Sequence, residues 1–195
     1  MAQLETRLRD FLEPLRDHGV GALLQAYAEA LGRGGEVEAE PLVRDGFGQI
    51  RRQGPLELPA RGDIAVTRDG RRLVHRIEGD GLESFEPITL VADGGFTTVL
   101  APFAWERAPM LVESRQPRPD WGALRRWYLE WFQPRMADVG PDFGGVLHRL
   151  DGPRETPAGW ALEVDFGTAP SAAVVGLMGA MAQSGALRLR IGHGG

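Results

Sequence analysis

The stretch Gly159-Trp160-Ala161-Leu162-Glu163-Val164-Asp165-Phe166-Gly167-Thr168-Ala169-Pro170 decides the fold that we predict for this chain of 195 residues. From Leu162 to Phe166 apolar and polar side chains alternate, which is the pattern of an antiparallel strand with one buried face. The apolar face carries Trp160, Leu162, Val164 and Phe166, and the polar face carries Glu163 and Asp165. Thr168 and Pro170 then favour the start of a helix.

Working outward, we predict a β-β-α-β unit in the last third of the chain. A strand over Gly145–Leu150 precedes the strand Trp160–Phe166, and a polar, proline-containing loop joins them. The helix runs to about Ser184, where Gly185 closes it. Leu187–Ile191 forms the last strand.

Upstream, a helix over 121–133 follows a proline-rich boundary at 116–120. We expect a helical hairpin at the N-terminus, with its first helix ending near Asp17-His18-Gly19 and its second near Gly32–Gly35. Between the N-terminal hairpin and the helix over 121–133, apolar and polar side chains alternate along residues 36–114. This pattern predicts an antiparallel β-meander of five or six strands. Asp69-Gly70 marks one of its hairpin turns.

The predicted fold class is therefore α+β: a helical hairpin, an antiparallel β-meander, an aromatic-rich crossing helix and a C-terminal β-β-α-β unit. We divide the chain into residues 1–115 and 120–192 and expect the two parts to pack as one compact domain. The strands of the second part either extend the sheet of the first part or form a sheet of their own.

The composition excludes several kinds of chemistry. All 22 basic residues are arginine, and the chain has no cysteine, lysine or asparagine. Without cysteine there is no disulfide, thiol nucleophile or cysteine-based metal site, and without lysine there is no Schiff base or Walker A loop. The loss of lysine and asparagine beside abundant arginine, alanine, glycine and proline indicates a GC-rich bacterial genome.

The charge pattern bears on partners and location. The net charge of -5 argues against a nucleic-acid partner. Charged residues in the first ten positions do not fit a signal peptide, and Pro170 breaks the longest uncharged stretch, residues 166–187, so we expect no membrane partner. We therefore expect a cytoplasmic protein.

The helix over 121–133 is the first candidate binding feature. Its wheel gathers Trp121, Trp127, Tyr128 and Trp131 on one side. Such an aromatic set suits a ligand or partner groove, and it equally suits a core helix packed across the sheet, which we favour.

The helix near the C-terminus offers a second candidate. Ala173, Gly176 and Ala180 form an uncharged ridge of small residues, which lets another backbone approach closely. Either another part of the same chain covers this ridge, which we favour, or the ridge forms a homodimer contact.

Possible chemistry gathers around His148. Candidate acid–base residues are His148, Glu163 and Asp165, with Asp142 and Asp151 nearby in the sequence. Their spacing matches no metal motif, so we predict neither a metal site nor a cofactor, and a structural histidine is the favoured interpretation. The four serines do not occur in a hydrolase motif.

Two hypotheses about function remain. The first, which we favour, is a non-enzymatic protein of the immunity, antitoxin or secretion-accessory type that binds another protein, with a basic protein as one option. It would use the uncharged ridge and an acidic edge formed by Glu36, Glu38, Glu40, Glu78 and Asp80. The acidic residues equally suit a solvated edge strand. The second hypothesis is a small enzyme or small-molecule-binding domain that uses the tryptophan-rich helix and a His148/Asp165 site.

Overall fold

The computed structural model describes residues 2–77, 79, 84–92, 94–133 and 143–193. Within them, three helices and eleven strands make an α+β protein, which confirms the predicted fold class. No helix in this described part combines the length and the apolar character that crossing a membrane requires.

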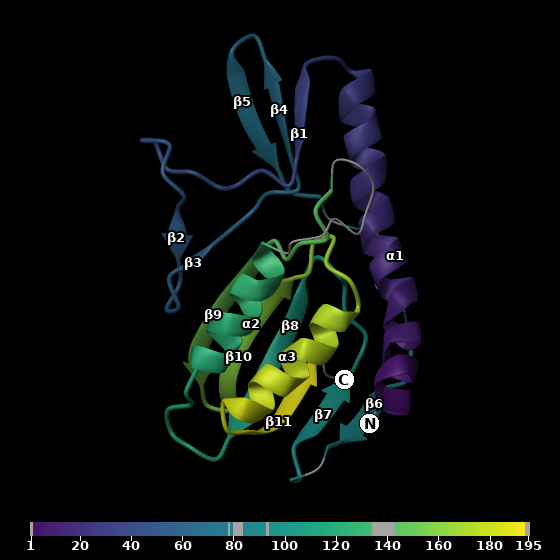
Figure 1. Cartoon of the computed structure of the whole chain (residues 1–195), viewed down its shortest axis with the longest axis vertical. Coiled ribbons are helices and arrows are strands. Elements are labelled where there is room, and N and C mark those ends of the chain that lie inside the picture. Colours follow the sequence, from purple (N-terminus) through teal and green to yellow (C-terminus); the bar gives the residue numbers. More distant parts are fainter. Residues whose placement is uncertain (1, 78, 80–83, 93, 134–142, 194–195) are drawn as a thin grey trace.

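A six-stranded sheet forms the body of the molecule, with the strand order β6-β7-β11-β8-β10-β9. Its strands are β6 (Ile88–Val91), β7 (Thr97–Leu100), β8 (Ala108–Ser114), β9 (Arg149–Thr156), β10 (Gly159–Asp165) and β11 (Ala186–Ile191). Neighbouring strands run antiparallel except β7 and β11, which are parallel. Helices α2 (Gly122–Phe132) and α3 (Ala172–Gln183) cover one face (Figure 1).

The sequence of β10 explains why the helices pack on that face. Leu162, Val164 and the following Phe166 are buried, whereas Glu163 and Asp165 point to the other side. The predicted β-β-α-β order is present as β9-β10-α3-β11.

The first strand of that unit begins later than predicted, because β9 covers the segment that we had expected to be a loop. Pro153 is tolerated inside it since β9 lies at the edge of the sheet, where a missing N–H costs no ladder bond.

A separate three-stranded sheet stands apart from the body (Figure 1), with the order β1-β4-β5. It consists of β1 (Glu36–Ala39), β4 (Ile64–Arg68) and β5 (Arg71–His75). In the sequence, a small two-stranded ribbon of β2 (Arg52–Gln53) and β3 (Leu58–Pro59) lies between β1 and β4. The hairpin at Asp69-Gly70 is confirmed, with positive φ angles of 50° and 72°.

The single meander predicted for residues 36–114 is therefore wrong. Its strands are divided among two sheets and a ribbon, and β11 separates β7 from β8. Alternation with period two indicates strands but does not select their partners. The boundary between the predicted parts 1–115 and 120–192 runs through the main sheet, because β8 of the first part lies between β11 and β10 of the second part.

The predicted N-terminal hairpin is also wrong: α1 (Ala2–Gly32) is one helix with Pro14 inside it. Its buried face runs through the expected break, since Leu8, Leu12 and Leu15 join the main core and Leu23 joins a second core under the small sheet. Gly19 permits close packing rather than ending the helix, because an added Cβ there would lie 2.8 Å from the Cβ of Trp105.

This packing predicts opposite effects for two neighbouring glycines. Gly21 has open space around its Cβ position, so Gly21→Ala should raise the free energy of unfolding by up to ~1 kcal/mol through helix propensity. Gly19→Ala should lower it, because Trp105 must move. Urea denaturation of both variants checks this. Stabilisation by both substitutions would contradict the contact between α1 and Trp105.

Candidate active-site cleft

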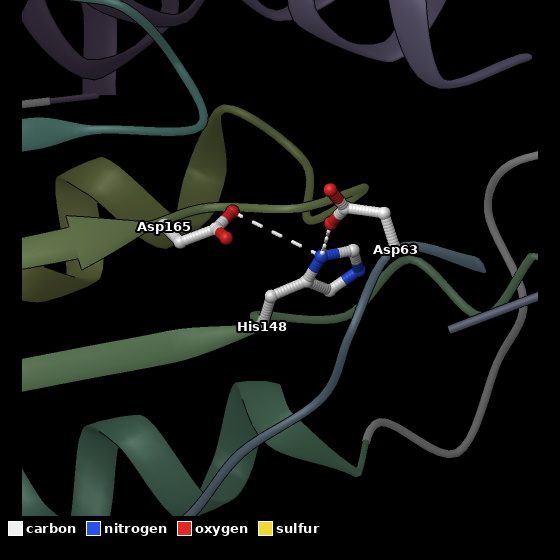
Figure 2. A group of neighbouring side chains, drawn as sticks. All are labelled: Asp63, His148 and Asp165. Carbon is white, nitrogen blue, oxygen red and sulfur yellow. Dashed lines mark hydrogen bonds and ion pairs between the residues drawn. The ribbon is translucent and has the colours of Figure 1, made fainter. Parts of the chain in front are cut away.

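His148 lies at the centre of a buried polar network just before β9, and its side chain has no exposed surface. Its Nε2 lies 2.9 Å from Glu40 Oε1, and its Nδ1 lies 2.6 Å from Asp63 Oδ1. Asp165 Oδ1 approaches the same Nδ1 at 3.9 Å. Figure 2 shows the two aspartates converging on this ring nitrogen.

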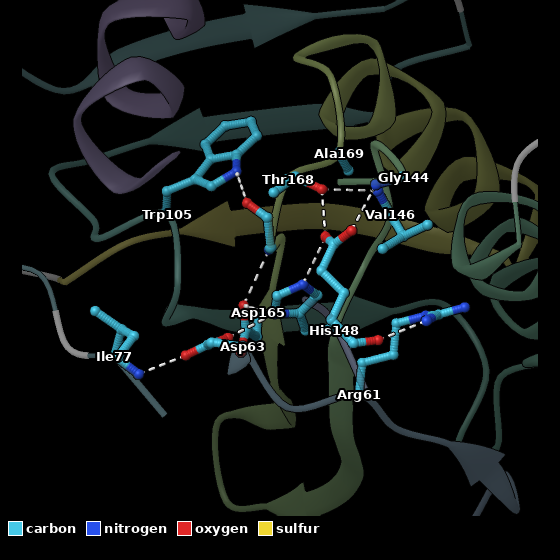
Figure 3. Close-up of polar contacts among 12 residues, drawn as sticks. Arg61, Asp63, Ile77, Trp105, Gly144, Val146, His148, Asp165, Thr168 and Ala169 are labelled. Carbon is cyan, nitrogen blue, oxygen red and sulfur yellow. Dashed lines mark hydrogen bonds and ion pairs between the residues drawn. The ribbon is translucent and has the colours of Figure 1, made fainter. Parts of the chain in front are cut away.

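Glu40 is fixed on the far side of the ring. Its Oε2 accepts a hydrogen bond of 2.6 Å from the Gly144 N–H, and its Oε1 accepts one from the Thr168 hydroxyl. Glu40 has a positive φ of 47° at the end of β1, a conformation that turns the chain there. The carboxyl group of Glu40 is therefore held in one position by His148, Gly144 and Thr168, three residues that Figure 3 labels.

The two aspartates are anchored by backbone groups. Asp63 Oδ2 accepts a hydrogen bond from the Ile77 N–H, and Asp165 Oδ1 accepts one of 3.0 Å from the Gly167 N–H. Gly167 has a positive φ of 52°, and a side chain there would collide with the ring of His148. A glycine is thus required where the strand β10 turns towards α3.

These contacts set the protonation states of the site. Burial alone would lower the pKa of His148, but hydrogen bonds to Asp63 and Glu40 and the nearby charge of Asp165 raise it to about 10. Burial raises the pKa of Asp165 to about 7, against the lowering effect of His148. Burial would also raise the pKa of Glu40, yet its contacts with His148, Gly144 and Thr168 hold it below its usual value.

A cleft of about 190 Å³ opens next to this network, and Asp63 and Asp165 line it. It lies between the polar face of β9–β10 and the segment that follows β5. Its other charged side chains are Arg76, Glu106, Arg107, Arg149, Asp151, Glu163 and His193. His148 itself is covered, so a ligand in the cleft meets the two aspartates first.

Asp63, His148 and Asp165 could hold a metal ion. Each offers one ligand atom, and the three atoms lie within 4.8 Å of one another. The sequence did not suggest this group, because Asp63 is 85 residues from His148 and matches no local motif. Glu40 was singled out only as part of an acidic edge, and Asp63 was missed. An isolated Asp after a glycine in a loop carries no sequence signal of such a role.

The structure brings the three predicted acid–base candidates to one place. Glu163 and Asp165 lie on the same face of β10 and both line the cleft, with His148 behind Asp165. Asp151 also lines the cleft and pairs with Arg149. Asp142 lies outside the described residues.

The aromatic residues of α2 mostly serve the core. Trp127 and Tyr128 are buried, and the Trp127 N–H donates a hydrogen bond of 2.9 Å to the Ala173 carbonyl. Trp121 and Trp131 are half-buried and pack against the same core. The Tyr128 hydroxyl donates to the Pro59 carbonyl at 2.7 Å and also lies 3.3 Å from the His148 carbonyl, so α2 supports the backbone of the site.

The uncharged ridge of α3 is covered by α2. Ala173 and Ala180 are buried, and a Cβ added at Gly176 would lie 3.2 Å from the Trp127 ring. The small residues therefore let two helices of the same chain approach closely.

The residues of the predicted acidic edge are separated. Glu40 is buried in the His148 network, whereas Glu38 is exposed and forms an ion pair of 2.6 Å with Arg72. Glu36 is also exposed. Glu78 and Asp80 lie outside the described residues.

Comparison with protein-family models, with curated proteins and with solved structures finds no match. The function must therefore be argued from the geometry of this chain.

The network predicts that the His148 ring stays protonated well above neutral pH in metal-free buffer. Because its folded pKa of about 10 exceeds the ordinary 6.5, its contribution to stability is complete below pH 6.5 and is lost as the pH rises through about 10. The free energy of unfolding should therefore fall by up to about 1.4 kcal/mol per pH unit over this window.

Ring ¹⁵N chemical shifts, assigned with a His148→Gln variant, give the protonation state directly, and urea denaturation between neutral pH and pH 10 gives the stability. In the variant this part of the pH dependence should be absent. A neutral His148 ring at about pH 8 in the folded protein would contradict the ionic contacts with Glu40 and Asp63.

Proposed function

We propose that the protein is a metal-dependent enzyme that holds one divalent cation at the inner end of the cleft, on His148 Nδ1 and the carboxylates of Asp63 and Asp165. The observation that carries this proposal is the orientation of His148. Glu40 occupies Nε2, so Nδ1 is the nitrogen that faces the two aspartates. A ligating histidine usually has its other ring nitrogen held by such a carboxylate, which fixes the tautomer.

The distances support a cation at this position. Bonds of about 2.0–2.2 Å would set the ligand atoms roughly 3–3.5 Å apart. Nδ1 lies 2.6 Å from Asp63 Oδ1, which is shorter than that separation, and 3.9 Å from Asp165 Oδ1, which is longer. Movements of less than about 1 Å would therefore place all three atoms around one ion, which would replace the proton between Nδ1 and Asp63.

The open side of the group favours catalysis over a purely structural role. Two of the three ligands line the cleft, so a water molecule or a substrate oxygen can complete the coordination there. Glu163 lines the same cleft and is a suitable acceptor for a proton from that water. A cation held there would act as a Lewis acid that activates this water towards an electrophilic carbon or phosphorus, and Glu163 would pass the proton to the leaving group.

The chemistry of the ligands limits the choice of ion. One imidazole and two carboxylates suit Zn²⁺ or Mn²⁺ better than Ca²⁺ or Mg²⁺, which prefer sets of oxygen ligands. The small volume of the cleft, about 190 Å³, suits the reactive end of a small polar substrate.

Titration calorimetry of the chelator-stripped protein with ZnCl₂ and MnCl₂ tests the site. We expect one cation per chain, and at least about ten-fold weaker binding by Asp63→Asn, Asp165→Asn and Glu40→Gln. Asp151→Asn is the matched control, because Asp151 lines the same cleft but pairs with Arg149. Circular dichroism confirms that each variant is folded. Failure of both cations to bind, or equal binding by Asp165→Asn and Asp151→Asn, would refute the metal site.

Hydrolysis of p-nitrophenyl acetate and p-nitrophenyl phosphate, with and without the cation that binds, tests the enzymatic part. We expect metal-dependent turnover of one ester and its loss in Asp165→Asn. Metal binding without turnover of either ester would argue against hydrolysis and leave a metal-binding protein.

A further inference from the structure

Strand β5 presents an unpaired edge on the small sheet. Within the described residues it pairs only with β4, and all five of its residues are exposed. Residues that flank a two-residue turn form a hydrogen-bonded pair, and here these are Arg68 and Arg71. Alternation then directs the N–H and C=O groups of Arg72 and Val74 away from β4. Another extended chain could bond to them.

A groove of about 730 Å³ runs beside this edge, between the small sheet and the C-terminal half of α1. Its apolar lining includes Ala26 and Ala30 of α1, Ile64 and Val66 of β4, and Leu73 of β5. Leu73 is 62% exposed and Val74 is 44% exposed. The edge thus combines free backbone groups with apolar side chains that have little cover.

The charge around this edge is positive, although the whole chain carries a net charge of -5. The groove side carries Arg68 and Arg71 against Asp69, while Arg33 pairs with Glu29 of α1. Among the described residues Arg68 bonds to the carbonyl groups of Arg33 and Gly34, so its charge is not neutralised there. Arg71 has no hydrogen-bond or ion-pair partner among the described residues, whereas Arg72, on the opposite face of the sheet, pairs with Glu38.

We propose that β5 and the adjoining groove dock an extended, acidic segment of a partner protein, which adds to the small sheet as a fourth strand. Main-chain hydrogen bonds to β5 would supply affinity, and alternate apolar side chains of the segment would enter the groove. On this same groove side, acidic side chains at the end of the segment next to the Asp69-Gly70 turn would face Arg68 and Arg71, which would select against basic sequences.

The other edge of β4 already carries a strand of this chain. Strand β1 pairs antiparallel with β4 and turns Val37 and Ala39 towards α1, so apolar side chains of a neighbouring strand fit on that face of the sheet. The groove shares Ile77 with the lining of the cleft but none of its charged residues, and the docking proposal does not depend on the metal site.

The probe is a capped, fluorescein-labelled peptide in which threonine alternates with a second series of residues, two glutamates followed by valines, so that glutamate and valine share one face of the strand. It is titrated against the full chain by fluorescence anisotropy. We expect saturable binding below about 1 mM. Arg71→Glu should weaken binding at least about ten-fold, whereas Arg188→Glu on β11 of the main sheet, an exposed matched control, should leave it unchanged. In ¹⁵N spectra the amide signals of Arg72 and Val74 should shift with peptide.

Two further peptides separate strand pairing from simple charge attraction. A version N-methylated at alternate residues keeps every side chain but cannot pair, and a version with arginine in place of glutamate reverses the charge; neither should bind. The alternative, that the arginines only protect an exposed edge from aggregation, predicts no binding of the acidic peptide. The proposal would be overturned by that result, by equal binding of the N-methylated peptide, or by an equal loss of affinity in Arg71→Glu and Arg188→Glu.

Discussion

The burial of one charged imidazole between two carboxyl groups is the constraint on which the rest of this structure depends. Glu40 and Asp63 flank strands of the small sheet, whereas His148 directly precedes β9 and Asp165 ends β10 of the main sheet. Removing one partner of a buried ion pair costs about 3–5 kcal/mol, because the other charge is left without compensation. The two sheets are thus joined by a contact that neither can lose alone, and the cleft lies at this junction.

The same contact gives the two ring nitrogens different roles. Nε2 faces Glu40, Thr168 and Gly144 in the interior, where every group is already bonded. Nδ1 faces the two aspartates that line the cleft. A structural imidazolium needs one acceptor for each of its two N–H groups, and Glu40 and Asp63 supply both. The second aspartate near Nδ1 and the cleft beside it go beyond that need, and they support the proposed metal site.

The sequence predicted the parts of the fold that depend on local patterns. The alternation of β10, the Asp69-Gly70 hairpin and the aromatic stripe of α2 each follow from spacing within a dozen residues. The prediction from sequence failed where contacts between residues far apart in the chain determine the structure. Gly19 was predicted to end a helix, because the close packing that explains this glycine is against Trp105, 86 positions away in the sequence. Glu40 looked like a surface acid because nothing in an alternating acidic strand marks the residue that pairs with His148. His148 and Asp165 were candidates from residue type alone, but Asp63 could be found only in three dimensions.

Crystals grown with Zn²⁺ test the central claim most directly, through an anomalous difference map measured at the zinc absorption edge. The account predicts one peak at the inner end of the cleft, about 2.0–2.2 Å from His148 Nδ1 and from one carboxylate oxygen each of Asp63 and Asp165, with Nε2 still bonded to Glu40. A map with no peak there, in which Nδ1 remains hydrogen-bonded to Asp63, would contradict it.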